Sequence, residues 1–269
     1  MKLYFALSSG EDNKQILNAH PEAYILASYY YFNKRTRLEQ LKEFNVFQTD
    51  RFILDSGAFS AFTLNKEINI YEYIDFIKEH KIKQYANLDA IGDPKQTNLN
   101  LNIMRKNGLN PKPVFHTGES LDYLDNIIEC EYIALGGMVG HTNLEDWLDK
   151  VFNYIYKKNS KIKIHGFGMT NYKLIKKYPW FSVDSTSWLA PVAFGRFKKW
   201  DEQRKRFETI ETDQILKDEK ITYENKMPAK VRNMLLTKQV KDLMKFEHYV
   251  NNREKNTDFS YITSQKTLF

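Results

Sequence analysis

Cysteine and long apolar runs are scarce in this sequence of 269 residues. Its single cysteine, Cys130, excludes an internal disulfide and a zinc site built from several cysteines. No window approaches 18 consecutive apolar residues, which excludes a transmembrane helix, and the apolar run at the N-terminus is too short for a signal peptide. We therefore expect a cytoplasmic protein with no membrane contact.

The composition is typical of a globular protein, but the charge is unevenly distributed. Hydrophobic residues make up 42% and charged residues 28% of the chain. The net charge is +6, and residues 196–269 carry 17 Lys and Arg against 12 Asp and Glu, so most of the positive excess lies there. Two interpretations remain open: this part binds a polyanion, or it is a solvated helical appendage.

Short β-branched or aromatic runs alternate with helical patterns along residues 1–195. There are eight such runs: Lys2–Ser8, Ala23–Tyr31, Arg51–Leu54, Gln84–Leu88, Lys112–Phe115, Tyr132–Leu135, Lys161–Ile164 and Trp180–Val183. Helices are predicted between them over Glu11–Asn18, Thr36–Phe44, Asn69–His80, Thr97–Asn107, Ser120–Ile128, Asn143–Lys157 and Asn171–Lys177. Eight alternating units favour an α/β protein with a (β/α)8 TIM barrel over residues 1–195, with an open doubly wound sheet as the alternative.

The pattern changes after Gly195. Helical spacing covers Phe197–Glu208 and Pro228–Asn251, so residues 196–269 are predicted to form a basic, mostly helical C-terminal extension packed on the barrel.

Polar residues gather where the predicted strands end, and in a barrel these ends meet at one mouth. Asp184 follows the strand before it directly, where a rigid carboxylate suits attack at an anomeric carbon. Asp55 ends another strand, and two carboxylates at one mouth can divide the roles of nucleophile and general acid/base. The alternatives are a helix or loop cap for Asp184 and a turn role for Asp55.

Other strand ends carry residues suited to binding a flat base. Asp89 can accept hydrogen bonds from a purine, and the glycine pairs Gly136-Gly137 and Gly166-Phe167-Gly168 suggest a slot for a planar group or, alternatively, tight turns. Ser56 would place a backbone N–H group near a ligand, and Phe59 is the best-placed ring to stack on a base, whereas His116 and His165 at two further strand ends are typical of structural or hydrogen-bonded histidines. The two histidines with the three aspartates leave a metal cluster as an alternative, but no His-x-His pair ends the first strand, and we expect neither metal nor cofactor.

In this order the strand ends resemble the tRNA-guanine transglycosylase superfamily. The matching segments are Leu54-Asp55-Ser56-Gly57-Ala58-Phe59, Asn87-Leu88-Asp89, Ala134-Leu135-Gly136-Gly137, His165-Gly166-Phe167-Gly168 and Ser182-Val183-Asp184-Ser185. The resemblance covers roughly residues 2–195 and is strongest to the phage and bacterial branch that inserts 7-deazaguanine bases into DNA.

The resemblance implies base exchange through a covalent intermediate. Asp184 matches the nucleophile that attacks C1′ of a target guanosine, and Asp55 matches the acid/base that handles the base proton. Asp89 matches the carboxylate that reads the purine edge, His116 stands where the family usually has a glutamine, and Gly137 stands where a backbone amide contacts the base. With the resemblance, the residues expected to bind the base are Ser56, Phe59, Asp89, His116, Gly136, Gly137, His165 and Gly166. The incoming base would be a 7-deazaguanine similar to preQ0, and the cytoplasm would be that of a host if the protein is phage-encoded.

Departures from the tRNA enzymes favour DNA over tRNA as the substrate. Those enzymes have a cysteine-rich zinc site, which Cys130 alone cannot build, and they follow the nucleophile with Pro-Thr-Arg, where this chain has Ser185-Thr186-Ser187. The backbone of the nucleic acid is expected to be held by Lys198, Lys199, Arg204, Lys205 and Arg206. A nucleoside or nucleotide N-glycoside hydrolase, a metal-dependent amidohydrolase and a non-catalytic nucleic-acid-binding barrel remain as alternatives.

Overall fold

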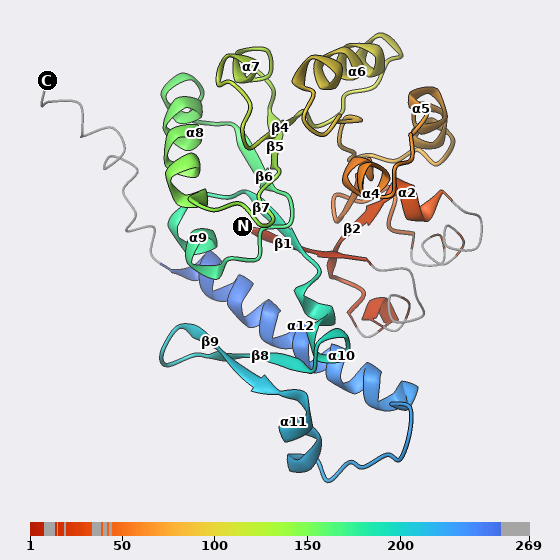
Figure 1. Ribbon diagram of the computed structural model, residues 1–269, viewed down its shortest axis with the longest axis vertical. Coiled ribbons are helices and arrows are strands. Elements are labelled where there is room, and N and C mark those ends of the chain that lie inside the picture. The colour runs from red at the N-terminus through yellow and green to blue at the C-terminus, as the bar shows by residue number, and fades with distance from the viewer. Residues whose placement is uncertain are drawn as a thin grey trace, which may run out of the picture.

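The computed structural model describes residues 1–7, 14, 16–18, 20–33, 39, 42 and 45–253. Its centre is a curled parallel sheet of seven strands with helices around its outer side (Figure 1). The strands are β1 (Lys2–Ala6), β2 (Tyr24–Ser28), β3 (Phe52–Asp55), β4 (Val114–His116), β5 (Tyr132–Gly136), β6 (Lys163–Gly166) and β7 (Ser182–Ser185). They are ordered β3-β2-β1-β7-β6-β5-β4. The predicted alternation of strands and helices is therefore confirmed for seven of the eight strands.

Most predicted helices are present, and asparagine side chains begin two of them. The helices are α2 (Tyr29–Phe32), α4 (Ala58–Thr63), α5 (Ile70–Glu79), α6 (Pro94–Lys106), α7 (Asp122–Asp125), α8 (Leu144–Lys158), α9 (Tyr172–Lys177), the 3-10 turn η1 (Ser187–Leu189), α10 (Ala190–Ala193), α11 (Thr212–Asp218) and α12 (Ala229–Asn252). Asn69 and Asn171 accept backbone N–H groups at the starts of α5 and α9. The helices predicted over Glu11–Asn18 and Thr36–Phe44 lie largely outside the described residues.

Two predicted strands differ from the structure. The strand predicted over Ala23–Tyr31 ends at Ser28, and its aromatic residues begin α2. The strand predicted over Gln84–Leu88 is reduced to single parallel bridges, Tyr85 with Leu54 and Ala86 with Lys112. Regular pairing stops beyond Asn87, where the N–H of Val114 donates to the Asn87 side chain instead of a backbone oxygen (2.9 Å).

The sheet separates two sets of buried side chains. A large apolar core lies between the sheet and the surrounding helices. The concave side holds smaller apolar clusters formed by Tyr4, Ala6, Leu26, Ile53, Ala86, Val114 and Ala134, with Phe167 against both. Alternation along each strand sends every second residue to this side, so polar residues two positions from these apolar ones face it too.

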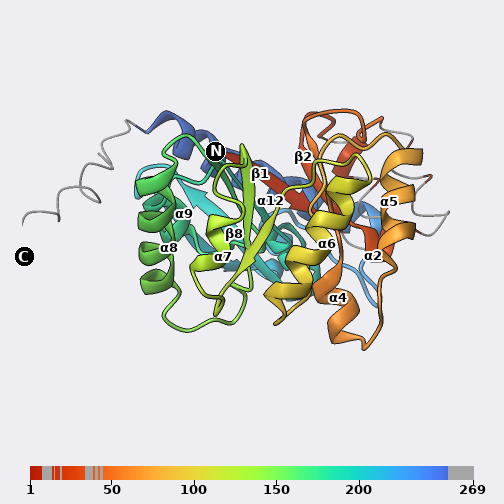
Figure 2. The same ribbon diagram turned by 90° about the horizontal axis from the view of Figure 1, so that it is seen from above.

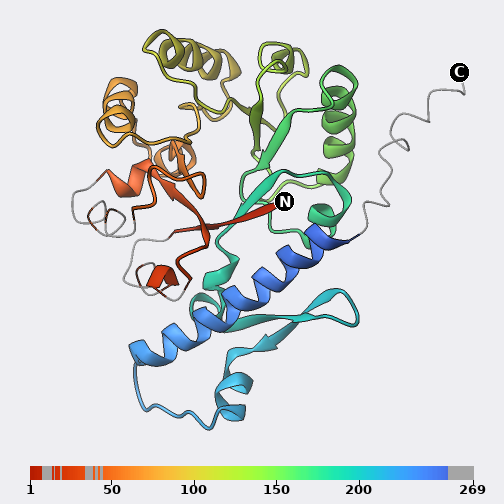
Figure 3. The same cartoon turned by 180° about the vertical axis from the view of Figure 1, so that it is seen from behind.

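The C-terminal part corrects one helix prediction and confirms another. Residues predicted as a helix over Phe197–Glu208 form an antiparallel hairpin of β8 (Arg196–Asp201) and β9 (Arg206–Glu211). The helix predicted over Pro228–Asn251 is α12, which runs diagonally between the strands of the large sheet and the hairpin (Figure 3). Gln239 of α12 is fully buried. Its Oε1 accepts the N–H of Lys198 and its Nε2 donates to the C=O of Lys198, so the backbone groups of Lys198 on the unpaired edge of β8 have hydrogen-bond partners.

Candidate active site at the carboxyl ends of the strands

Three aspartates predicted to act together lie at one end of the sheet. Asp55 is the last residue of β3, Asp184 lies near the end of β7, and Asp89 follows the segment that bridges β3 and Lys112. The carboxylates of Asp89 and Asp184 both raise the pKa of Asp55, which places each of them within electrostatic reach of Asp55. The structure therefore brings together residues that are up to 129 positions apart in the sequence.

Asp184 is held by contacts from the neighbouring strand. Its side chain is buried, with 6% of the residue exposed. Its Oδ1 accepts the N–H of Gly168 (3.0 Å) and lies 3.2 Å from Nε2 of His165. The turn that follows is capped by Ser185, whose Oγ accepts the N–H of Ser187 (2.9 Å). Capping, the alternative role for Asp184, is thus performed by its neighbour.

His165 belongs to a hydrogen-bonded chain inside the curled sheet. Its Nδ1 lies 2.5 Å from Ser182 Oγ, which bonds the hydroxyl of Tyr132. Burial raises the pKa of Tyr132, so this hydroxyl keeps its proton. With the Asp184 carboxylate as the acceptor at the end of the series, His165 carries its proton on Nε2, its Nδ1 accepts from Ser182, and Ser182 accepts from Tyr132.

Ser182, His165 and Asp184 are the residue types of a Ser-His-Asp catalytic triad, but Ser182 cannot act as its nucleophile. The Ser182 residue is fully buried, and its hydroxyl is enclosed between Tyr132 and His165. A substrate carbonyl has no access to that oxygen, so acyl transfer through Ser182 is excluded. The hydrogen-bonded series ends at Asp184, and the other members orient its carboxylate.

Asp55 has the most strongly perturbed carboxyl group of the site. Desolvation, followed by the carboxylates of Asp89 and Asp184, raises its pKa to about 8, against hydrogen bonds from backbone N–H groups that lower it. One of these donors is Gly57, 3.0 Å from Asp55 Oδ2, so Asp55 also forms the turn that begins α4. At neutral pH, Asp55 is a carboxylic acid and can donate a proton.

Asp89 is fixed by a second network. Ser56 Oγ donates to Asp89 Oδ1 (2.7 Å), and His116 Nε2 lies 2.9 Å from Asp89 Oδ2. Nδ1 of His116 lies 3.2 Å from Glu119, a residue that the sequence analysis did not identify, although its position three residues after His116 is a usable signal. Burial alone would lower the pKa of His116, but hydrogen bonds to Asp89 and Glu119 raise it to about 9.

This network changes the expected role of His116. Both of its ring nitrogens are engaged by carboxylates and the residue is buried, so its ring is not open to a base. Its charge instead holds Asp89, whose two oxygens each retain a lone pair for a ligand.

The glycines at the strand ends make room for protein side chains. A Cβ at Gly136 would lie 2.7 Å from the His116 ring, and one at Gly166 would lie 2.9 Å from the Trp180 ring. Gly137 has φ +71° and faces Thr117, as a tight turn requires. Packing and turn geometry therefore explain these three glycines, and the slot predicted for a planar group is not needed to account for them.

Phe59 lies on the rim of this end rather than within it. It is 64% exposed on α4, the helix that follows β3 and projects beyond the sheet at the lower edge of Figure 2. Two further exposed apolar residues, Val139 and Phe194, come shortly after β5 and β7. Of these three side chains, Phe59 and Phe194 have aromatic rings that provide flat surfaces for stacking.

The cations predicted to hold nucleic acid are not all near the aspartates. Leu3, near the start of β1, donates its N–H to Glu247 of α12 (2.9 Å), so the last turns of α12 lie at the amino ends of the strands.

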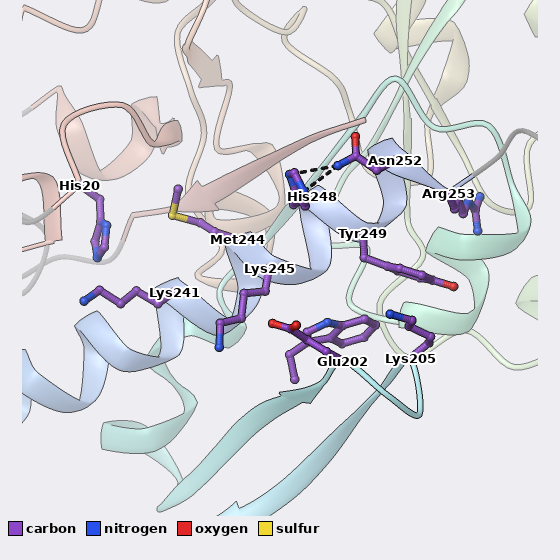
Figure 4. A pocket seen from close by; sticks show the side chains of 11 residues that line it. His20, Glu202, Lys205, Lys241, Met244, Lys245, His248, Tyr249, Asn252 and Arg253 are labelled. Carbon is purple, nitrogen blue, oxygen red and sulfur yellow. Dashed lines mark hydrogen bonds between the residues drawn. The ribbon is translucent and has the colours of Figure 1, made fainter.

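The cations of the hairpin turn lie beside these turns of α12. The Nζ of Lys205 lies 5.4 Å from the centroid of the Tyr249 ring, in a groove of about 760 Å³ (Figure 4). Arg204 and Arg206 pair with Glu208. The hairpin turn is thus at the opposite end from Asp184.

Lys198 and Lys199 lie along β8, between these two ends. The Nζ of Lys198 donates to Thr209 Oγ1 of β9 (2.8 Å), and Lys199 is exposed. Neither contacts the aspartates through a hydrogen bond or ion pair among the described residues.

Comparison with known proteins assigns no family to the chain. Among the described residues, no group of three or more His, Cys, Asp and Glu side chains is arranged to hold a metal ion. No described helix combines the length and apolar character needed to span a membrane. No protein-family model matches the chain, and no curated protein matches it either.

Proposed function

We propose that the protein exchanges a guanine in nucleic acid for a 7-deazaguanine base. The observation that carries the proposal is the meeting of Asp55 and Asp184 at one end of the sheet. Asp55 is protonated at neutral pH because burial and its acidic neighbours raise its pKa, while Asp184 accepts two N–H donors. One group can supply a proton and the other can attack carbon, as glycosyl transfer requires.

In the first step, an oxygen of Asp184 forms a bond to C1′ of the target nucleotide and the bond from C1′ to the guanine nitrogen breaks. Asp55 gives its proton to the departing base. In the second step, the incoming base loses its proton to Asp55, and its nitrogen bonds to C1′ as the bond to Asp184 breaks. Asp89, held by Ser56 and His116, accepts hydrogen bonds from the N–H groups of the base.

The finer architecture that we propose is a closed (β/α)8 barrel with Tyr85 and Ala86 as its eighth element. Four backbone hydrogen bonds support this arrangement: from Leu54 N to Gln84 O, Ala86 N to Leu54 O, Lys112 N to Tyr85 O and Asn87 N to Lys112 O, at 2.8–2.9 Å. Closure would place the three aspartates around one mouth.

DNA is the substrate that we favour, for the sequence reasons given above. The target nucleotide must leave its stack to reach Asp184. Phe59, exposed at the rim beside Asp55, is placed to stack on a displaced or neighbouring base.

A nucleic-acid-binding protein without catalysis is the second candidate, favoured by the groove in Figure 4. The groove combines Lys205, Lys241, Lys245 and Arg253 with the ring of Tyr249. Cations with an aromatic side chain are typical of surfaces that bind nucleic acid, and such binding would depend steeply on salt.

Exchange of radiolabelled guanine into DNA and into tRNA tests the proposal. We expect incorporation by the wild-type protein and by Asp75→Asn, an exposed control on α5, and none by Asp184→Asn. Release of guanine without incorporation would instead indicate a hydrolase. Binding that is lost at high salt, with neither release nor exchange, would favour the second candidate.

A further inference from the structure

A second cavity lies at the amino ends of the strands, away from the aspartates. Its volume is about 360 Å³. Lys2, Tyr132 and Lys163 line it and are the first residues of β1, β5 and β6, and Lys112, which precedes β4, lies beside them. All parallel strands begin at one end of the sheet, so this position follows from the topology.

Lys112 is the unusual residue of this cavity. Only 9% of the residue is exposed, and its Nζ lies 4.6 Å from the centroid of the Tyr132 ring. Among the described residues, no carboxylate forms a hydrogen bond or ion pair with it. Burial lowers its pKa to about 8; Asp50 and Glu131 oppose this shift, and Lys163 and Lys2 add to it. A buried ammonium group without a paired acid is costly unless a ligand compensates it.

Other cations face the same space. The Nζ atoms of Lys2 and Lys163 each lie 5.2 Å from the Phe181 ring, and Lys163 also pairs with Glu131. Four lysines line the cavity, Lys83 being the fourth, against the two acids Asp50 and Glu131. Aromatic rings stabilise ammonium groups only in part, so a local excess of positive charge remains.

We propose that this cavity binds a phosphate group, either free or at the end of a nucleotide. The excess of four lysines over two acids matches the charge of a phosphate dianion. Lysine recognises phosphate as a point charge, and the cavity is far larger than the roughly 30 Å³ that one water occupies. The bound anion would lie on Lys112 and compensate its buried charge. This site is separate from the proposed exchange reaction and does not depend on it.

Binding of inorganic phosphate to the full chain, measured by calorimetry against chloride at equal ionic strength, tests the proposal. We expect Lys112→Met to weaken binding at least tenfold, because Met keeps the linear side chain and removes the charge. Lys150→Met, on the exposed face of α8, should bind as the wild type does. Asp184→Asn should also bind normally, which separates this proposal from the exchange reaction.

A second measurement protects the test against a misfolded variant. In the wild-type protein, NMR titration of the Lys112 side chain should show a higher pKa when phosphate is present. A nucleoside 5′-monophosphate, used as a separate probe, distinguishes a free from an esterified phosphate. The proposal is overturned if neither probe binds, if Lys112→Met binds as tightly as the wild type, or if phosphate leaves the titration of Lys112 unchanged.

Discussion

The two ends of the curled sheet have opposite chemistry. The carboxyl ends of the strands gather Asp55, Asp89 and Asp184, and the amino ends gather lysines around Lys112. At both ends, burial and like charges disfavour the ionised form, which raises the pKa of Asp55 and lowers that of Lys112. The comparison shows that a parallel sheet can gather side chains of opposite charge at its two ends. The first residues of all its strands lie at one end, and the last residues lie at the other.

The two ends are joined through the interior of the sheet. Tyr132 lies under the Lys112 ammonium group at one end, and its hydroxyl begins the chain that reaches Asp184 at the other. Substitutions at the acidic end should impair base exchange and leave phosphate binding intact, and Lys112→Met should do the reverse.

The largest effect is expected from Asp184→Asn. The amide keeps the shape of the side chain but cannot act as the nucleophile, so the exchange rate should fall by about 10³-fold or more. Single-turnover exchange with an oligonucleotide measures this loss. A rate within tenfold of the wild type would remove Asp184 from the reaction.

Asp55→Asn should lower exchange by about 10²-fold or more, because the amide cannot donate the proton. It should also change the pH dependence of folding. The pKa of Asp55 is raised from 3.8 to about 8, so its contribution to stability is full at low pH and is lost as the pH rises from about 4 to 8.

The pH effect of Asp55→Asn is measured by urea unfolding at pH 5 and pH 9. The free energy of unfolding of the variant should decrease less between these values than that of the wild type. An equal decrease in both proteins would contradict the raised pKa.

His116→Gln should reduce exchange by about tenfold, because Asp89 loses its charged partner. The pKa of His116 is raised from 6.5 to about 9, so its contribution to stability is full below pH 6.5 and is lost as the pH rises through 9. Unfolding midpoints at pH 6 and pH 10 should therefore differ less in the variant than in the wild type. If the two proteins show the same difference, the interaction of His116 with Asp89 and Glu119 is not what stabilises its charge.

The smallest effect on exchange is expected from Ser182→Ala, which interrupts the chain between Tyr132 and His165. The variant should lose about 1–3 kcal/mol of stability, because the buried hydroxyl of Tyr132 loses its partner. Exchange should fall only a few-fold, with a shifted pH profile, since Asp184 keeps the N–H of Gly168. Ser120→Ala, on an exposed turn, is the matched control. Stability equal to that of the control would show that the chain does not contribute.

Sequence patterns predicted the features that depend on neighbouring residues in the chain, such as where a strand ends and which residue follows it. Strand ends are visible in the sequence, so Asp55 and Asp184 could be placed at one end of the sheet. The prediction of a helix over Phe197–Glu208 is wrong: Phe197 and Trp200 are three residues apart, a spacing that is also typical of a helix. Pairing across β8 and β9 joins Phe197 to Ile210 and Trp200 to Phe207, and packing on α12 outweighs the helical spacing.

Interactions that depend on register could not be predicted in the same way. The contact of Glu119 with His116, and that of Tyr132 with Ser182, follow from strand pairing and side-chain direction. The glycines illustrate the same limit, because the ring that Gly136 accommodates belongs to another strand. The reduction of the segment at Tyr85 and Ala86 to single bridges depends in the same way on a contact between segments, that of the Val114 N–H with the Asn87 side chain.

The central claim is that Asp184 forms a bond to the sugar of a guanine nucleotide while Asp55 handles the proton. Peptide mapping by mass spectrometry, after incubation with a guanine-containing oligonucleotide and rapid denaturation, tests it most directly. The account predicts a nucleotide adduct on the peptide that contains Asp184, and none in Asp184→Asn. Exchange that proceeds without an adduct, or with an adduct on another residue, would contradict it.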